Sequence, residues 1–107
     1  MRAGKLRHRI TIQQNTPTQN SFGEMEPSWS AFATIWAAVE PLSGDERWTS
    51  DQFQSEVSHR IRIRRRVGIT PLMRVSWQGR LFDIQAVLEP ESNRRELHLL
   101  CSEVQGG

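Results

Sequence analysis

The sequence predicts an all-β protein, a small antiparallel β-barrel of about six strands, and three observations indicate this fold class. Apolar and polar residues alternate with a period of two in several segments, as in strands that bury one face. These segments recur at roughly 8 to 12 residue intervals, which is typical of small barrels and sandwiches. Turn-forming residues separate them, among them Gln78-Gly79, a two-residue connection typical of a β-hairpin. One long loop or short helix is expected after the second or third strand.

The expected strands follow in order along the chain. Residues 6–13 alternate cleanly and form the first strand, and the polar run 15–27 is a loop or hairpin tip. One or two strands are expected in 29–39, because this segment is rich in Ile, Val and aromatic residues, although four alanines weaken the pattern. The later strands are expected at 57–64, 73–77, 81–84 and 96–104.

The segment 43–54 allows two interpretations. Ser43 and Glu46 have the spacing of a capping box, which favours a short helix. Gly44 and several small polar residues favour a loop instead, because Trp48 and Phe53 are the main apolar anchors. Both alternatives stay open at this point.

Length and composition predict one domain spanning residues 1–107. No run of about 18 apolar residues occurs, so no membrane contact is expected. The N-terminal segment lacks the apolar stretch of a secretory signal, which predicts a protein made and used in the cytoplasm or in something assembled there. Cys101 is the single cysteine, so neither an internal disulfide nor a Cys-based metal site is expected.

Candidate catalytic groups are sparse. His8, His59 and His98 each fall inside an alternating strand pattern, which favours a structural histidine over a catalytic one. Cys101 is in register with two leucines and is expected to be packed. The sequence contains no glycine-rich phosphate loop and no cluster of metal-ligating residues at a recognised spacing. We therefore expect no catalytic residue, no cofactor and no metal, and the protein is not expected to be an enzyme.

Charge is segregated along the chain although the net charge is only +2. Residues 1–10 and 57–80 carry basic residues without any acid, whereas 15–56 holds seven acids against Arg47 alone. Such a molecule suits either an anionic partner on its basic side or head-to-tail contact between copies of itself.

The most basic segment places Arg60, Arg62 and Arg64 on one face of an expected strand. These arginines could keep an exposed or edge strand soluble, contact another subunit, or contact a DNA backbone without reading its sequence. No helix-turn-helix or zinc-finger pattern accompanies them, and aromatic residues are not interleaved with them. A free-standing barrel that binds nucleic acid through residues 58–66 is the alternative from another functional class.

Five segments together resemble the phage head closure family, also called head-tail joining or stopper proteins, and the similar subunits of gene transfer agents. The segments are MRAGKLRHRITIQ, FGE with a following W, IWAAVEPLSGDE, SEVSHRIRIRRRVGITPLMRVSWQGRLFDIQAV and RRELHLLCSEV. Each is unspecific alone, but they occur in order over nearly the whole chain, from Leu6 to Val104.

The resemblance implies a structural virion protein at the head-tail interface, assembled in the host bacterial cytoplasm. Its subunits would form a homo-oligomeric ring that closes the DNA exit channel after packaging and offers a surface for tail docking. The implied partners are a portal-bound adaptor ring above, tail terminator or tail tube proteins below, and packaged double-stranded DNA contacted without sequence specificity. The tail terminator itself is an alternative within the same class.

The resemblance also implies a projecting loop at about 43–55 that takes part in gating the channel. Its candidate residues are Ser43, Gly44, Asp45, Glu46, Arg47, Trp48, Asp51 and Phe53. Acidic side chains there would make the channel unfavourable to phosphate, and the two aromatic side chains could interlock with neighbouring copies. Candidates for a subunit interface or a DNA-facing surface are Arg7, Arg9, Arg60, Arg62 and Arg64. The expected ring contact pairs the basic strands 5–13 and 58–66 with the acidic stretch 24–46 of the next copy.

Overall fold

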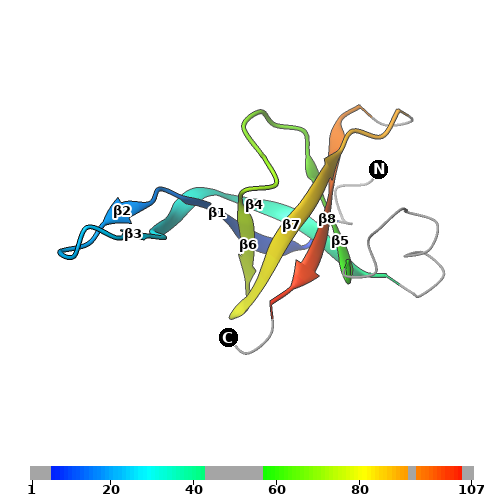
Figure 1. Cartoon of the computed structure of the whole chain (residues 1–107). Coiled ribbons are helices and arrows are strands. Elements are labelled where there is room, and N and C mark those ends of the chain that lie inside the picture. The colour runs from blue at the N-terminus through cyan, green and yellow to red at the C-terminus, as the bar shows by residue number, and fades with distance from the viewer. Residues whose placement is uncertain (1–5, 43–56, 92–93, 105–107) are drawn as a thin grey trace.

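The computed structural model describes residues 6–42, 57–91 and 94–104. Within these ranges the chain forms eight strands and no helix. Six strands close into an antiparallel barrel in the order β1-β4-β5-β8-β7-β6, and β2 and β3 form a separate two-stranded sheet (Figure 1). The prediction of a small antiparallel barrel is thus confirmed. The segment 43–54, for which a helix and a loop were both open, lies outside the described residues.

The strand bounds follow the alternation of the sequence. The strands are β1 (His8–Asn15), β2 (Thr18–Gln19), β3 (Met25–Glu26), β4 (Trp29–Pro41), β5 (His59–Arg64), β6 (Arg74–Trp77), β7 (Arg80–Leu88) and β8 (Glu96–Glu103). The alanine-rich segment forms one long strand, β4, instead of two. The expected hairpin between β6 and β7 is present, with both Gln78 and Gly79 at positive φ.

The core consists of the inward residues of all six barrel strands. Its fully buried large side chains include Ile10, Ile12, Ile61, Ile63, Val75, Phe82 and Leu99. Cys101 is buried among them, and this burial raises the pKa of its thiol. His59 packs edge-on against Phe82, and His8 packs edge-on against Trp77. These two histidines therefore have structural contacts within the barrel. The described part of the chain contains no helix that could span a membrane.

A hairpin arm extends from the barrel. We call residues 15–28 the arm; it comprises β2, β3 and their connecting turn, and it continues the β1–β4 hairpin beyond the barrel wall (Figure 1). A backbone hydrogen bond from Thr16 to Ser28, at 2.8 Å, links the arm to this hairpin. The arm makes the molecule elongated, with principal extents of 49 × 28 × 25 Å. The sequence predicted a loop or hairpin tip here, and the projection at 43–55 that the resemblance implies lies outside the described residues.

The tip of the arm is ordered mainly by the side chain of Asn20, and the Nε2 of Gln19 adds a hydrogen bond to the carbonyl oxygen of Gly23 at 3.1 Å. The Oδ1 of Asn20 accepts hydrogen bonds from the backbone amides of Phe22 (2.8 Å) and Glu24 (2.9 Å). Its Nδ2 donates to the carboxylates of Glu24 (3.3 Å) and Glu26 (3.0 Å). Gly23 adopts a φ of +85°, which glycine reaches without the steric cost of a Cβ. The turn therefore has a defined shape although it lies far from the core.

Candidate interaction surface

The basic strand β5 lies inside the barrel wall, not at an edge. It pairs with β4 on one side and with β8 on the other. The interpretation that its arginines protect an exposed sheet edge is therefore wrong, because closure of the barrel leaves β5 without an unpaired side. The function of each arginine depends on what its own side chain contacts.

Arg60 and Arg62 are neutralised within the chain. The β4–β5 register places Glu40 directly opposite Arg60. The Nε of Arg60 lies 3.1 Å from Oε1 of Glu40, and Nη2 of Arg62 lies 2.9 Å from Oε2 of the same carboxylate. The Arg62 side chain is only 16% exposed. One acid from the predicted ring-contact stretch is thus already paired with the basic strand of its own chain.

A second carboxylate extends this network. Nη1 of Arg62 lies 3.6 Å from Oε1 of Glu96, and Nε2 of His98 lies 3.2 Å from the same oxygen. Glu96 is buried, and its Oε2 has no hydrogen-bond partner within the part of the chain that the structure describes. Arg62 therefore holds together three strands, β4, β5 and β8. Sequence reasoning did not identify Glu96, although its position opposite Arg64 in β8 follows from the strand pairing.

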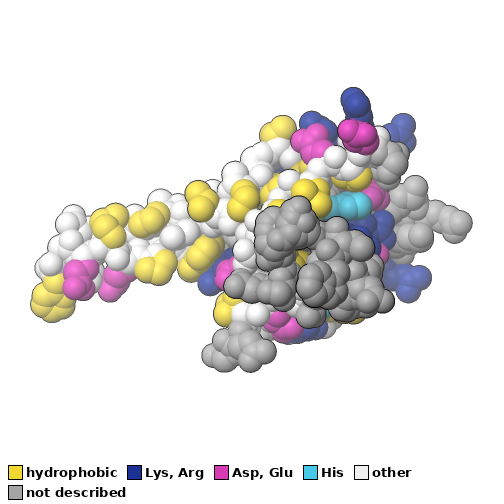
Figure 2. Space-filling model, turned by 45° about the vertical axis from the view of Figure 1, so that its right-hand side comes forward, with side chains coloured by type: hydrophobic (Ala, Val, Ile, Leu, Met, Phe, Trp, Pro, Cys, Tyr) yellow, Lys and Arg dark blue, Asp and Glu magenta, His cyan; other side chains and the backbone are white. Residues whose placement is uncertain are grey.

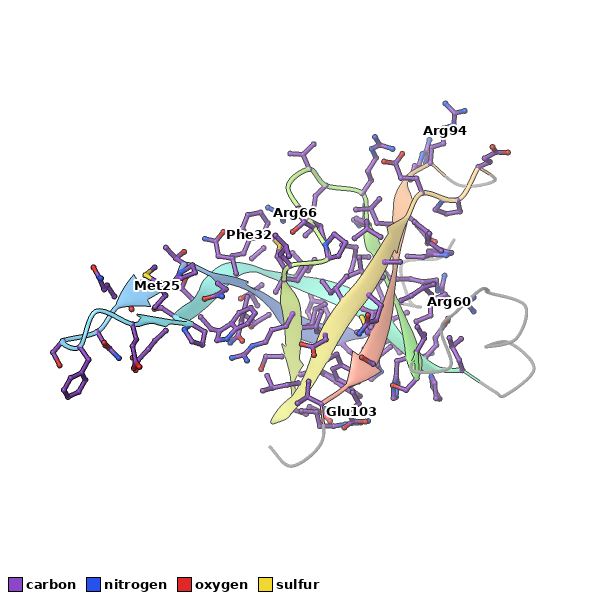
Figure 3. The ribbon with its side chains drawn as sticks, in the orientation of Figure 1. Met25, Phe32, Arg60, Arg66, Arg94 and Glu103 are labelled. Carbon is purple, nitrogen blue, oxygen red and sulfur yellow. The ribbon has the colours of Figure 1, made fainter. Side chains whose placement is uncertain are left out.

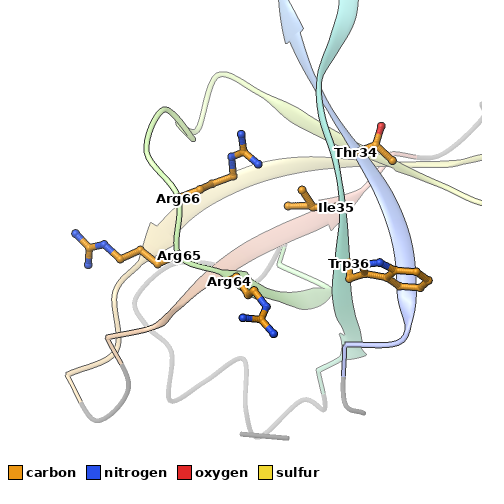
Figure 4. A pocket seen from close by; sticks show the side chains of 6 residues that line it. All are labelled: Thr34, Ile35, Trp36, Arg64, Arg65 and Arg66. Atoms are coloured by element: carbon orange, nitrogen blue, oxygen red, sulfur yellow. The ribbon is translucent and has the colours of Figure 1, made fainter. Parts of the chain in front are cut away.

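The arginines that follow lie around a hollow. We call it the basic hollow; it has a volume of about 290 Å³ and is lined by Thr34, Ile35, Trp36, Arg64, Arg65 and Arg66. Figure 4 shows the first three coming from β4 and the arginines from the end of β5 and the segment after it. Trp36 is 51% exposed. The basic hollow thus combines an apolar wall with cationic side chains.

The three arginines of the basic hollow have different partners. Arg65 forms an ion pair with Glu89 at 2.7 Å, and both side chains are about half exposed. The guanidinium of Arg66 lies 5.7 Å from the ring centre of Phe32. Arg64 is exposed and forms no ion pair with any residue in the described ranges. Much of the positive charge around the hollow therefore remains available.

The remaining predicted interface residues are divided between two places. Arg9 pairs with Trp36 across the β1–β4 ladder, and its guanidinium lies 5.2 Å from the indole ring. The structure therefore brings Arg9 and Arg64 to the same tryptophan-lined region. Arg7 is exposed just before β1. All eight predicted gating residues, from Ser43 to Phe53, lie outside the described residues.

The arm carries a surface that sequence reasoning missed. Phe22 is 87% exposed and Met25 is 64% exposed. Glu24 and Glu26 lie beside them, and the sequence has no lysine or arginine between Arg9 and Arg47. Figure 2 shows hydrophobic and acidic side chains along the arm and basic side chains on the barrel. The available signal was the sequence Phe22-Gly23-Glu24-Met25, in which apolar residues interrupt a polar run.

One further ion pair fixes the β7–β8 side of the barrel. Arg80 donates two hydrogen bonds to Glu103, each 2.8 Å long. The hydrogen bond from Arg80 is the main cause that lowers the pKa of Glu103, and the same bond raises the pKa of Arg80. Among the described residues, no group of His, Cys, Asp and Glu could hold a metal ion.

These features define a small antiparallel barrel with two separate candidate contact surfaces, an apolar and acidic arm and a basic hollow, and with histidines and a cysteine that have structural contacts. The sequence matches the phage head completion protein family over residues 1–104, and the chain belongs to this family. It is therefore a structural virion protein, in a family of virion components rather than enzymes.

Solved structures share the fold, among them two with the following likeness to this chain. The solution structure of protein SF1141 from Shigella flexneri 2a is 32% identical, with a TM-score of 0.80 and complete coverage of both chains. A chain from the virion of a native gene transfer agent particle is 24% identical, with a TM-score of 0.66, and the match covers 92% of this chain and 96% of that chain. The second likeness concerns the fold alone. A comparison with curated proteins finds no match.

Proposed function

We propose that this protein is a ring subunit of the head-tail connector of a tailed phage or phage-like particle. In this role it closes the DNA exit channel after packaging and provides the surface on which a tail docks. The observation that carries the proposal, beside family membership, is the separation of two different contact surfaces of opposite charge on one elongated chain. Head-to-tail contacts between unlike surfaces close into rings when the rotation between copies permits.

The partners proposed for this ring are those of a connector. They are further copies of the chain, a portal-bound adaptor ring above, tail terminator or tail tube proteins below, and packaged double-stranded DNA contacted without sequence specificity. The ring would assemble in the host cytoplasm and remain in the virion. The gating role of residues 43–55 forms part of this proposal.

The alternative of a nucleic-acid-binding module is disfavoured by the ion pairs of β5. Glu40 and Glu96 contact Arg60 and Arg62, so two of the three arginines expected to contact phosphates are already engaged. A duplex or single-strand affinity in the micromolar range, with a steep dependence on salt, would favour that alternative over a ring subunit. Membership of the head completion family argues against a tail terminator.

Deletion of the gene in the producing strain tests the proposal. The particles would be imaged by negative-stain electron microscopy, and their nuclease-protected DNA would be quantified. We expect heads of normal size that have lost packaged DNA, together with unattached tails, and a plasmid copy of the gene should restore both. Tailed particles that retain their DNA after deletion would contradict the proposal.

A further inference from the structure

We propose that the arm tip of one copy docks into the basic hollow of the next copy. This inference rests on the proposed ring function and identifies the contact that would build the ring. The sequence predicted a broad contact between basic strands and an acidic stretch. The inference narrows this contact to two small surfaces, the arm tip of one copy and the basic hollow of the next.

The arm tip has the properties of a docking element. Phe22, on the turn that the Asn20 side chain orders, and Met25, at the start of β3, are both exposed to water. Large apolar side chains exposed together commonly mark an interaction site. Because the turn is already ordered, binding would cost little additional conformational entropy.

The basic hollow can accommodate the aromatic side chain of the arm. Its volume of about 290 Å³ exceeds the roughly 150 Å³ of an engineered cavity that binds benzene. Ile35 and the exposed Trp36 offer apolar and aromatic contacts to a phenyl ring. Phe22 is therefore the residue that we place in the hollow.

Charge complements this fit. Glu24 and Glu26 lie beside the apolar residues of the arm, and both carboxylates accept hydrogen bonds from the neutral Asn20 side chain. Arg64 and Arg66 lie at the hollow without an ion pair in the described ranges. Contacts between the carboxylates of one copy and these guanidinium groups would orient the arm. Glu40 is a poor candidate for this contact, because its own chain already pairs it with two arginines.

The occupant is a second copy rather than the chain's own arm. Figure 3 shows Met25 out on the arm, while Arg66 and Phe32 lie near the barrel where the arm begins. The arm continues the β1–β4 hairpin away from the barrel, so its tip cannot fold back onto this hollow without breaking that ladder. Each copy therefore offers an arm to one neighbour and a hollow to another, which is a head-to-tail contact.

Disulfide trapping in assembled particles tests the inference. A full-length chain carrying Ser21→Cys and Thr34→Cys keeps Phe22, places one thiol beside it on the arm tip and one in the hollow, and leaves the buried Cys101 shielded from the reaction. After oxidation with copper phenanthroline, we expect a ladder of disulfide-linked multimers. A matched chain with Ser21→Cys and Gln85→Cys, whose second position is exposed on β7, should stay monomeric. Monomers from both chains would overturn the inference.

A charge exchange in solution tests the same contact independently. Ser21→Cys and Thr34→Cys would be carried on separate chains, both with Phe22 in place, and mixed. Glu24→Lys on the arm partner or Arg64→Glu on the hollow partner should slow trapping roughly 10-fold, since like charges oppose the contact. Combining both substitutions should restore the rate. Glu91→Lys and Arg94→Glu, exposed and outside the hollow, are controls of equal charge change and should leave it unaltered.

The outcomes separate this inference from the proposed function. Equal trapping rates in all charge variants would overturn the arm-to-hollow contact. Particles that keep DNA and tails but yield no ladder would remove the inference and leave the connector role intact. Tailed, DNA-filled particles after gene deletion would instead remove the connector role, whatever the trapping result.

Discussion

The arm extends from the two barrel strands β1 and β4, but different interactions stabilise the arm and the barrel. Within the barrel, β1 and β4 bury Ile10, Ile12 and Ala37 almost completely. Beyond the barrel, the same hairpin exposes Phe22 and Met25 and depends on backbone pairing and the side chain of Asn20. A two-stranded ribbon is only marginally stable alone. A substitution in the barrel should therefore change stability, whereas one in the arm should change contacts with partners.

The largest expected difference is between two phenylalanines. Phe82 is fully buried and contacts His59 and Trp77, so Phe82→Ala should lower the free energy of unfolding by about 3–5 kcal/mol. Phe22→Ala should change it by less than about 0.5 kcal/mol, because this ring is exposed. Urea unfolding followed by circular dichroism measures both. Equal losses would show that the arm contributes to the folded core.

A smaller difference should separate two arginines of β5. Arg62→Ala leaves the carboxylates of Glu40 and Glu96 without their shared cation, one of them buried, and should cost about 1–3 kcal/mol. Arg64→Ala serves as the matched control and should cost less than about 0.5 kcal/mol. Thermal or urea unfolding distinguishes the two. An unchanged free energy of unfolding for Arg62→Ala would mean that the ion-pair network does not hold the three strands together.

The order of the arm can be changed without unfolding the barrel. Asn20→Ala removes the acceptor for the amides of Phe22 and Glu24, so these amides should exchange with solvent roughly 10-fold faster while the unfolding midpoint stays constant. Hydrogen exchange read by NMR resolves the arm from the barrel. Unchanged protection at both amides would show that the turn does not need this side chain.

The smallest expected effect concerns pH and the Arg80–Glu103 pair. Because the pKa of Glu103 is lowered in the folded chain, its ionised form stabilises the fold above the ordinary glutamate value of about 4.3. This contribution disappears as the pH falls through the lowered pKa. Glu103→Gln should therefore lower the melting temperature slightly at neutral pH and leave it unchanged in strong acid. The exposed Glu91→Gln is the control, and a difference that grows toward acid would contradict the assignment.

The barrel could be predicted because the patterns that indicate its strands and turns lie within short segments of the sequence. Alternation with a period of two, as in Ile10-Thr11-Ile12 and Ile61-Arg62-Ile63, specifies which face of a strand is buried. A two-residue turn such as Gln78-Gly79 then specifies its connection. The long strand β4 was harder to predict, because alanine favours helices and is depleted in strands.

The interaction surface depends on register, which the sequence does not display. Glu40 meets Arg60 across 20 positions of sequence, and Glu96 meets Arg62 only because β5 and β8 are neighbours. The arm was not predicted as a projection because its pairing runs through polar residues, which give no hydrophobic period. The predicted gating segment at 43–55 stays a prediction.

The continuity of β1 and β4 into the arm has a mechanical consequence. A sideways force on the arm tip is transmitted to the barrel wall where β1 pairs with β6 through Thr11, Ile12 and Gln13, the shortest ladder of the barrel. Arg74 stabilises this ladder. Its Nε donates a hydrogen bond to the side chain of Gln13 at 2.6 Å, and its guanidinium lies 4.1 Å from the ring centre of Trp29. In the proposed ring, the β1–β6 ladder would be the first part of the barrel to separate under a mechanical load from the tail, and the contacts of Arg74 oppose that separation.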